Sequence, residues 1–80
     1  SLAHVAEADV AIFFKEDGPS AARISVRTKG EGPDATAIVG AFGGGGHARA
    51  AGATIERPVN EVVTLVLARV AELRAHNVAG

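Results

Sequence analysis

The chain has 80 residues, of which 48% are apolar and 21% charged, with a formal net charge of -1 and no cysteine. This composition predicts one small folded domain spanning residues 1–80, and it excludes a disordered tail or a disulfide-stapled scaffold. The near-zero charge argues against a surface that wraps long duplex nucleic acid, because such binding grows with the number of phosphates neutralised.

A targeting signal or a membrane span is not expected. Glu7 and Asp9 stand where a secretory signal carries positive charge, and the first apolar run is too short to cross a bilayer. We therefore expect a cytoplasmic protein. The chain also contains no methionine, which we interpret as the mark of a domain taken from a longer protein.

Two strands are expected in the first part of the chain. Residues 9–15 contain the apolar run VAIFF and precede the turn sequence EDGPS, which predicts a buried strand followed by a turn. Residues 22–29 alternate between apolar and polar side chains, which is typical of a strand with one buried face. We expect Ala22, Ile24 and Val26 on the buried face, and Arg23, Ser25, Arg27 and Lys29 on the open face.

A helix is expected from Asp34 to about Phe42. The Asp34 carboxylate can cap its amino terminus, and the four glycines at 43–46 stop it. The helical residues expected to pack inward are Ile38, Val39 and Phe42. A short helical turn at 48–51 and a third strand at about 53–56 should follow.

The last helix is expected over residues 59–75, because Pro58 favours a first helical turn and apolar residues recur at three- and four-residue spacing. This stripe consists of Val59, Val62, Val63, Val66, Val70 and Leu73. We interpret it as core rather than as a groove for a partner. Together the elements predict an α/β (α+β) fold, in which a small mixed β-sheet of at least three strands packs against two main helices.

The glycine run at 43–46 is the most unusual feature of the sequence. Ordering four glycines costs much conformational entropy, whereas one glycine suffices to stop a helix. Glycines without side chains can instead form a backbone cradle whose N–H groups bind an anion. The surroundings match neither a Walker loop nor a dinucleotide fingerprint. We expect Gly45→Val either to distort a backbone with positive φ or to block a ligand.

Several polar residues could bind an anion beside this run. His47 would lie at the mouth of the cradle with Arg49 nearby, while Arg27 could donate two hydrogen bonds to a phosphate and Ser25 a third. No combination of residues forms a metal-ligand set or a nucleophile and base pair. The aromatic residues, all expected to be buried, are Phe13, Phe14 and Phe42. The chain therefore predicts a binding module rather than a complete active site.

The stretch FGGGGHARAAGA at 42–53, preceded by SVRT at 25–28, resembles the DHH-associated carboxyl-terminal domain of DHH-family phosphoesterases. It is most similar to the oligoribonucleases that also dephosphorylate 3′-phosphoadenosine 5′-phosphate. The resemblance implies that a separate amino-terminal DHH domain holds two manganese ions and cleaves the ester. This chain would then bind substrate and contribute no catalytic residue, metal or cofactor.

The resemblance also implies which residues contact substrate. These are Ser25, Arg27, Gly44, Gly45, Gly46 and His47, and Thr28 stands where many relatives have serine. From the residues themselves we add Thr28, Lys29 and Arg49 as neighbours of this set. The implied ligands are short single-stranded RNA or DNA, or a nucleoside 3′,5′-bisphosphate, and the parent protein could form a homodimer. Two alternatives stay open: a cyclic-dinucleotide phosphodiesterase or single-strand exonuclease domain, and a non-catalytic regulatory or interaction module whose glycine loop is structural.

Overall fold

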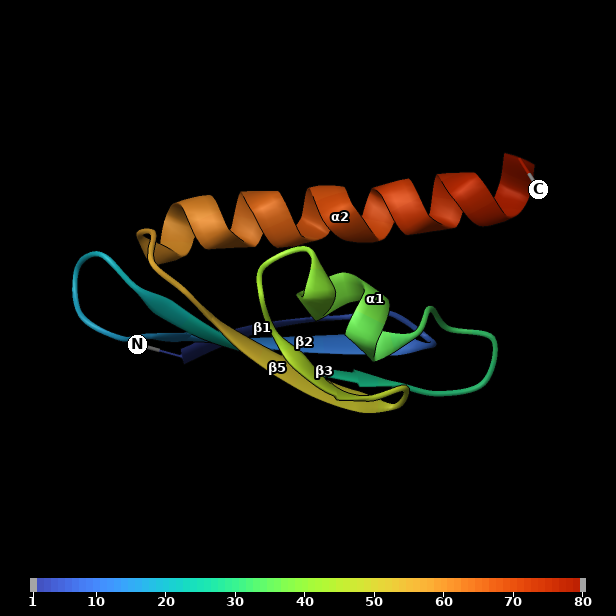
Figure 1. Cartoon of the computed structure of the whole chain (residues 1–80), viewed down its shortest axis with the longest axis horizontal. Helices are drawn as coiled ribbons and strands as arrows, with labels where there is room; N and C mark the ends of the chain where they lie inside the picture. Colours follow the sequence, from blue (N-terminus) through green and yellow to red (C-terminus); the bar gives the residue numbers. More distant parts are fainter. Residues whose placement is uncertain (1, 80) are drawn as a thin grey trace.

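The computed structural model describes residues 2–79, which form a single antiparallel sheet covered on one face by two helices (Figure 1). The elements are β1 (Leu2–Ala6), β2 (Val10–Glu16), β3 (Ala22–Thr28), α1 (Ala35–Gly40), β4 (Gly45–His47), β5 (Ala50–Ile55) and α2 (Val59–Ala79). The strand order across the sheet is β1-β2-β3-β5-β4. This confirms the α+β class with two helices, although the strands pair antiparallel throughout rather than in mixed directions.

The core lies between the sheet and the helices, and alternation along the strands decides which side chains enter it. Strands β2 and β3 each place every second residue against the helices; this alternation was predicted for β3, whereas β2 was predicted to be buried on both sides. From α2 the side chains of Val62, Val66 and Val70 reach this layer. The fully buried large side chains are Phe14, Ile12, Ile24, Ile38, Val26, Val39, Val62 and Val66. The apolar stripe of the last helix is therefore core, as expected.

Strand β1 was not expected from the sequence. It pairs antiparallel with β2 along five residues, from Leu2 opposite Lys15 to Ala6 opposite Ala11. Residues 3–6 are all exposed, so the segment carries no alternation of buried and exposed side chains. Its strand conformation depends on pairing with a neighbour, which a local pattern does not reveal.

Helix α1 begins and ends with the expected signals. The Asp34 carboxylate accepts a hydrogen bond from the Thr36 N–H at 2.8 Å, and the Thr36 hydroxyl also donates to it; both bonds hold the pKa of Asp34 below its usual value. At the other end, Gly43 has φ +77 and Gly44 N–H donates to the Val39 carbonyl at 2.9 Å. This is a glycine-terminated helix end, although the helix itself ends at Gly40, two residues before the expected position.

The segment after the glycines differs from expectation. A helical turn at 48–51 was wrong: residues 48 and 49 form the turn of a hairpin, and β5 begins at Ala50, three residues earlier than expected. Alanine favours helix, but six residues of β5 pair with β3 and Ala51 and Ala53 are buried against the helices. The tertiary pairing therefore overrides local propensity.

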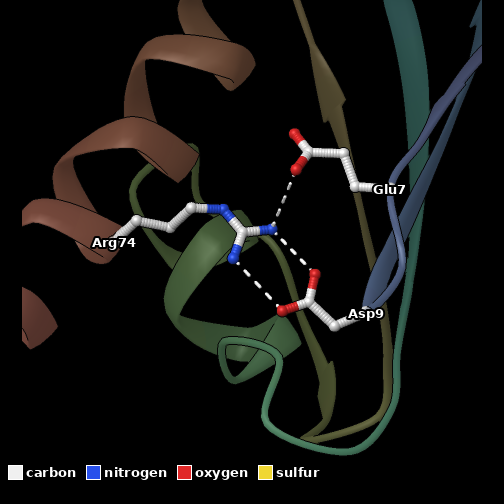
Figure 2. A network of polar contacts seen from close by, with 3 residues as sticks. All are labelled: Glu7, Asp9 and Arg74. Carbon is white, nitrogen blue, oxygen red and sulfur yellow. Dashed lines mark hydrogen bonds and ion pairs between the residues drawn. The ribbon is translucent and has the colours of Figure 1, made fainter.

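Polar contacts fix α2 over the sheet. Figure 2 shows the Arg74 guanidinium donating two hydrogen bonds to Asp9 at 2.8 and 3.2 Å, with Glu7 at 3.8 Å. These bonds hold the pKa of Asp9 below its usual value and raise that of Arg74. Arg69 Nε donates to the Ala37 carbonyl of α1 at 3.2 Å. None of the helices in residues 2–79 is long and apolar enough to cross a membrane.

Candidate functional site

The face of the sheet away from the helices carries the polar residues expected to bind a ligand. Strand register places Arg27 of β3 opposite Ala50 of β5, and Ala50 opposite His47 of β4. The three residues therefore form one row on the open face. Arg27 and His47 are two strand spacings apart, about 10 Å between their backbones, so a long arginine side chain and an imidazole can reach the same small anion.

A second row lies one pleat further along the same strands. Ser25 lies opposite Gly52, and Gly52 opposite Gly45. The two glycines expose backbone beside the Ser25 hydroxyl. A Cβ added at Gly45 would meet no atom within 4 Å, so the space above this residue is open. The structure thus brings together Ser25, Arg27, Gly45 and His47, which are up to 22 positions apart in the sequence.

The four glycines of the run have different structural roles. Gly43 ends α1 with a positive φ. Gly44 lies so close to β5 that an added Cβ would collide with the Gly52 carbonyl oxygen and come within 2.6 Å of Ala53 Cβ. Gly46 has φ +146, and its added Cβ would lie 2.6 Å from the Ala50 carbonyl oxygen. Three glycines are therefore required by the fold, and Gly45 is the one above which space is free.

The backbone cradle expected here takes the form of a sheet edge. Strand β4 is the terminal strand and pairs with β5 alone. A strand with one neighbour directs part of its N–H and C=O groups away from the sheet. The donors available to a ligand are therefore those of an edge strand, with the hairpin turn rather than a helix amino terminus following them.

The three additional residues, Thr28, Lys29 and Arg49, lie at one end of these rows. Thr28 is buried, and its hydroxyl donates to the Ala48 carbonyl at 3.1 Å; Arg49 Nη1 donates to the Gly30 carbonyl at 3.1 Å. Both contacts hold the hairpin turn against the loop that follows β3. Lys29 is exposed and lines a pocket of about 250 Å³ together with Arg27. The other residues around this pocket are Glu7, Ala8, Asp9, Val10, Ala11 and Thr28.

Charge is segregated between the two sides of the molecule. Among the described residues, three arginines on the helix side form ion pairs, and they belong to α2 or to the turn before it. The pairs are Arg57 with Glu61, Arg69 with Glu72, and Arg74 with Glu7 and Asp9. In the described strands, no position of the open face holds an acidic residue. The nine acidic residues lie in turns and loops, in α2 and at the last position of β2. The cations of the open face are Lys15, Arg23 and Arg27, and none has an ion-pair partner within residues 2–79.

Phe13 corrects the expectation that every phenylalanine is buried. Its side chain is 39% exposed on the open face, whereas Phe14 is 1% exposed and Phe42 is half-buried. The Phe13 ring stacks on His4 of β1, with ring centroids 5.4 Å apart and planes 24° apart. The signal was present in the sequence, because alternation from Val10 places residue 13 on the same side as the polar residue Lys15.

Metal ligands are not assembled in the part of the chain that the structure describes. Within residues 2–79, no three His, Asp or Glu side chains form a group able to hold a metal ion. The arrangement can bind an anion through the Arg27 guanidinium, the His47 imidazole, the Ser25 hydroxyl and backbone amides.

Comparison with known protein families gives a match. The model of the DHHA1 domain matches residues 1–74, which include every element of the sheet, α1 and most of α2. Among curated proteins, none matches this sequence significantly.

Proposed function

Because the chain belongs to the DHHA1 domain family, we propose that it binds the phosphate end of a short oligonucleotide or a nucleoside 3′,5′-bisphosphate for a phosphoesterase domain. DHHA1 domains are associated with DHH-family phosphoesterases and nucleotide binding, and they normally follow an amino-terminal DHH domain. In this proposal the DHH domain holds two manganese ions and cleaves the ester. The part that we propose for this chain is to bind the substrate.

The observation that carries the proposal is the alignment of Arg27 with His47 on a face whose described strand positions hold no carboxylate. Glu7 and Asp9, which border the same pocket as Arg27, are the nearest acidic residues of that pocket and pair with Arg74 of α2. A guanidinium can donate two parallel hydrogen bonds to phosphate, and an imidazole can donate one more. Ser25, one pleat away, supplies a hydroxyl, and the edge of β4 supplies backbone N–H groups. Within residues 2–79 the Arg27 side chain donates one hydrogen bond, to the neighbouring Val26 carbonyl at 3.2 Å, so most of its donors are available.

The same face limits the size of the ligand. Its strand positions carry three Lys or Arg side chains, Lys15, Arg23 and Arg27, and Lys29 lies beside Arg27, in a chain whose net charge is -1. Because affinity for long nucleic acids depends on many phosphate contacts, so few cations favour a mononucleotide or a short strand.

A titration of this chain with 5′-phosphorylated adenylyl-adenosine, followed by NMR, tests the proposal. We expect the shifted resonances to belong to residues 25–29 and 43–49. Replacing Arg27 or His47 by alanine should weaken binding roughly 10- to 100-fold, because a hydrogen bond to a charged group contributes about 1.5–3 kcal/mol. Arg57→Ala is the matched control, since Arg57 is an exposed arginine outside the open face.

Two results would overturn the proposal. One is the absence of shifts at millimolar nucleotide, which would favour an interaction module with a structural glycine loop. The other is equal binding by Arg27→Ala, His47→Ala and Arg57→Ala. Circular dichroism of each variant shows whether the fold is retained.

A further inference from the structure

Phe13 is an exposed aromatic residue that the phosphate site does not use. It lies on β2 between the buried residues Ile12 and Phe14, yet 39% of its surface is exposed. The exposed ring is supported from one side by stacking on His4. Exposing a large aromatic ring to water is unfavourable, and neither helix covers this face (Figure 1).

The neighbours of Phe13 are cationic or small. Its register partner on β3 is Ser25, and the diagonal neighbours on that strand are Arg23 and Arg27, about 7–8 Å away. Lys15 follows two residues later on the same face of β2. The ring therefore has two arginines as diagonal neighbours on β3, and no strand position of this face within residues 2–79 holds a carboxylate.

This composition does not fit a protein partner. The centre of a protein interface is depleted in charged residues and buries several apolar side chains together. Among open-face positions of residues 3–54, Phe13 is the single large apolar side chain, and its neighbours carry positive charge. Charge complementarity instead requires an anionic partner that also presents a flat aromatic group, and a nucleotide chain has both properties.

We propose that Phe13, backed by His4, is a platform on which one base of a short single-stranded oligonucleotide stacks, with Arg27 and Arg23 binding the phosphates on either side of that base. This inference rests on the proposed function and deepens it. A mononucleotide phosphate needs Arg27 and His47, whereas a strand of two or more nucleotides also covers Phe13 and Arg23. The platform thus selects oligonucleotides over smaller phosphates.

The experiment compares two ligands of equal charge: 5′-phosphorylated adenylyl-adenosine and the same backbone without bases. Because stacking on an aromatic side chain contributes about 1–3 kcal/mol per base, the chain should prefer the ligand with bases by roughly 5- to 150-fold. Phe13→Ala should lose this preference and keep its affinity for the abasic ligand. Leu67→Ala is the matched control, because Leu67 is 38% exposed on α2 and should change neither affinity.

A second variant keeps the test independent of any loss of stability in Phe13→Ala. The chain contains no tryptophan or tyrosine, so Phe13→Trp introduces a single fluorophore at the platform. We expect its emission to be quenched by the ligand with bases and unchanged by the abasic ligand. Phe13→Trp should bind the ligand with bases at least as tightly as the wild type does.

The outcomes separate the two proposals. If the wild type binds both ligands equally, with shifts at Arg27 and His47, the phosphate site stands and the platform is refuted. If Phe13→Ala retains the full preference for bases, or Phe13→Trp shows no quenching by a bound oligonucleotide, the platform is likewise refuted. If the wild type binds neither ligand, both the platform and the proposed function fail.

Discussion

Replacing Gly44 by alanine should destabilise the domain, although Gly44 and Gly45 are adjacent members of one glycine run. An added Cβ at Gly44 would collide with the Gly52 carbonyl oxygen and approach Ala53 Cβ to 2.6 Å and Val39 Cβ to 3.0 Å. Because the Gly52 carbonyl oxygen belongs to the main chain of β5, no rotation of a side chain can remove this collision. At Gly45 the same addition would meet nothing within 4 Å, and its φ is not positive.

The magnitude follows from two opposing terms. Overpacking typically costs about 1–3 kcal/mol, while replacing glycine by alanine gains about 0.4–1 kcal/mol by restricting the unfolded chain. Gly44→Ala should therefore lower the free energy of unfolding by about 1–2 kcal/mol. An 80-residue domain has a total of about 4–12 kcal/mol and loses roughly 4–8 °C in Tm per kcal/mol. The expected fall in Tm is roughly 4–16 °C.

Thermal unfolding followed by circular dichroism at 222 nm measures this difference, since the chain has no tryptophan or tyrosine for intrinsic fluorescence. Gly45→Ala is the control and should retain the free energy of unfolding of the wild type or raise it by up to about 1 kcal/mol, because no collision opposes the restriction of the unfolded chain. Gly45→Val should also fold but lose nucleotide binding. The φ of Gly45 is not positive, so the valine does not distort the backbone and instead obstructs the ligand. Equal Tm values for Gly44→Ala and Gly45→Ala would refute the division of roles within the run.

Three further predictions concern contacts around the site and the helices. Hydrogen bonds from Arg74 lower the pKa of Asp9 in the folded state, so the contribution of Asp9 to stability is complete above its ordinary pKa of 3.8 and is lost as pH falls through the lower folded value. Asp9→Asn should therefore reduce the dependence of Tm on pH below 3.8. An unchanged dependence would contradict this reasoning. Thr28→Val should lower unfolding free energy by about 0.5–1.5 kcal/mol, because the Ala48 carbonyl loses the threonine hydroxyl, whereas Thr28→Ser should retain most of the stability in urea unfolding. Asp34→Ala should cost about 0.5–2 kcal/mol through loss of the helix cap, and Asp34→Ser should restore it; equal urea midpoints for the two variants would argue against capping.

Local patterns in the sequence predicted β2, β3, the cap at Asp34 and the long helix, because each depends on periodicity or on a side chain near its own backbone. They also placed Ser25 and Arg27 on the open face, since alternation along one strand fixes the side on which each residue lies. The candidate site was therefore partly visible before any pairing was known.

The remaining features depend on contacts between distant segments. The alanine-rich residues that begin at Ala50 favour a helix by composition, but pairing with β3 holds them in a strand. The run that contains Phe13 was interpreted as wholly buried, whereas its alternation follows from a sheet covered on one face. The row formed by Arg27 and His47 requires the register of three strands, which no local pattern determines.

The open face of the sheet gathers positive side chains in a nearly neutral molecule. The three Lys and Arg residues of the open face must be balanced by a net charge of -4 on the rest of a chain whose total is -1. A small anion is therefore attracted to the open sheet rather than to the molecule as a whole, and its association rate should fall as salt is added. The domain can thus draw its ligand to this face while remaining close to zero charge and free of the general attraction for polyanions that a basic protein shows.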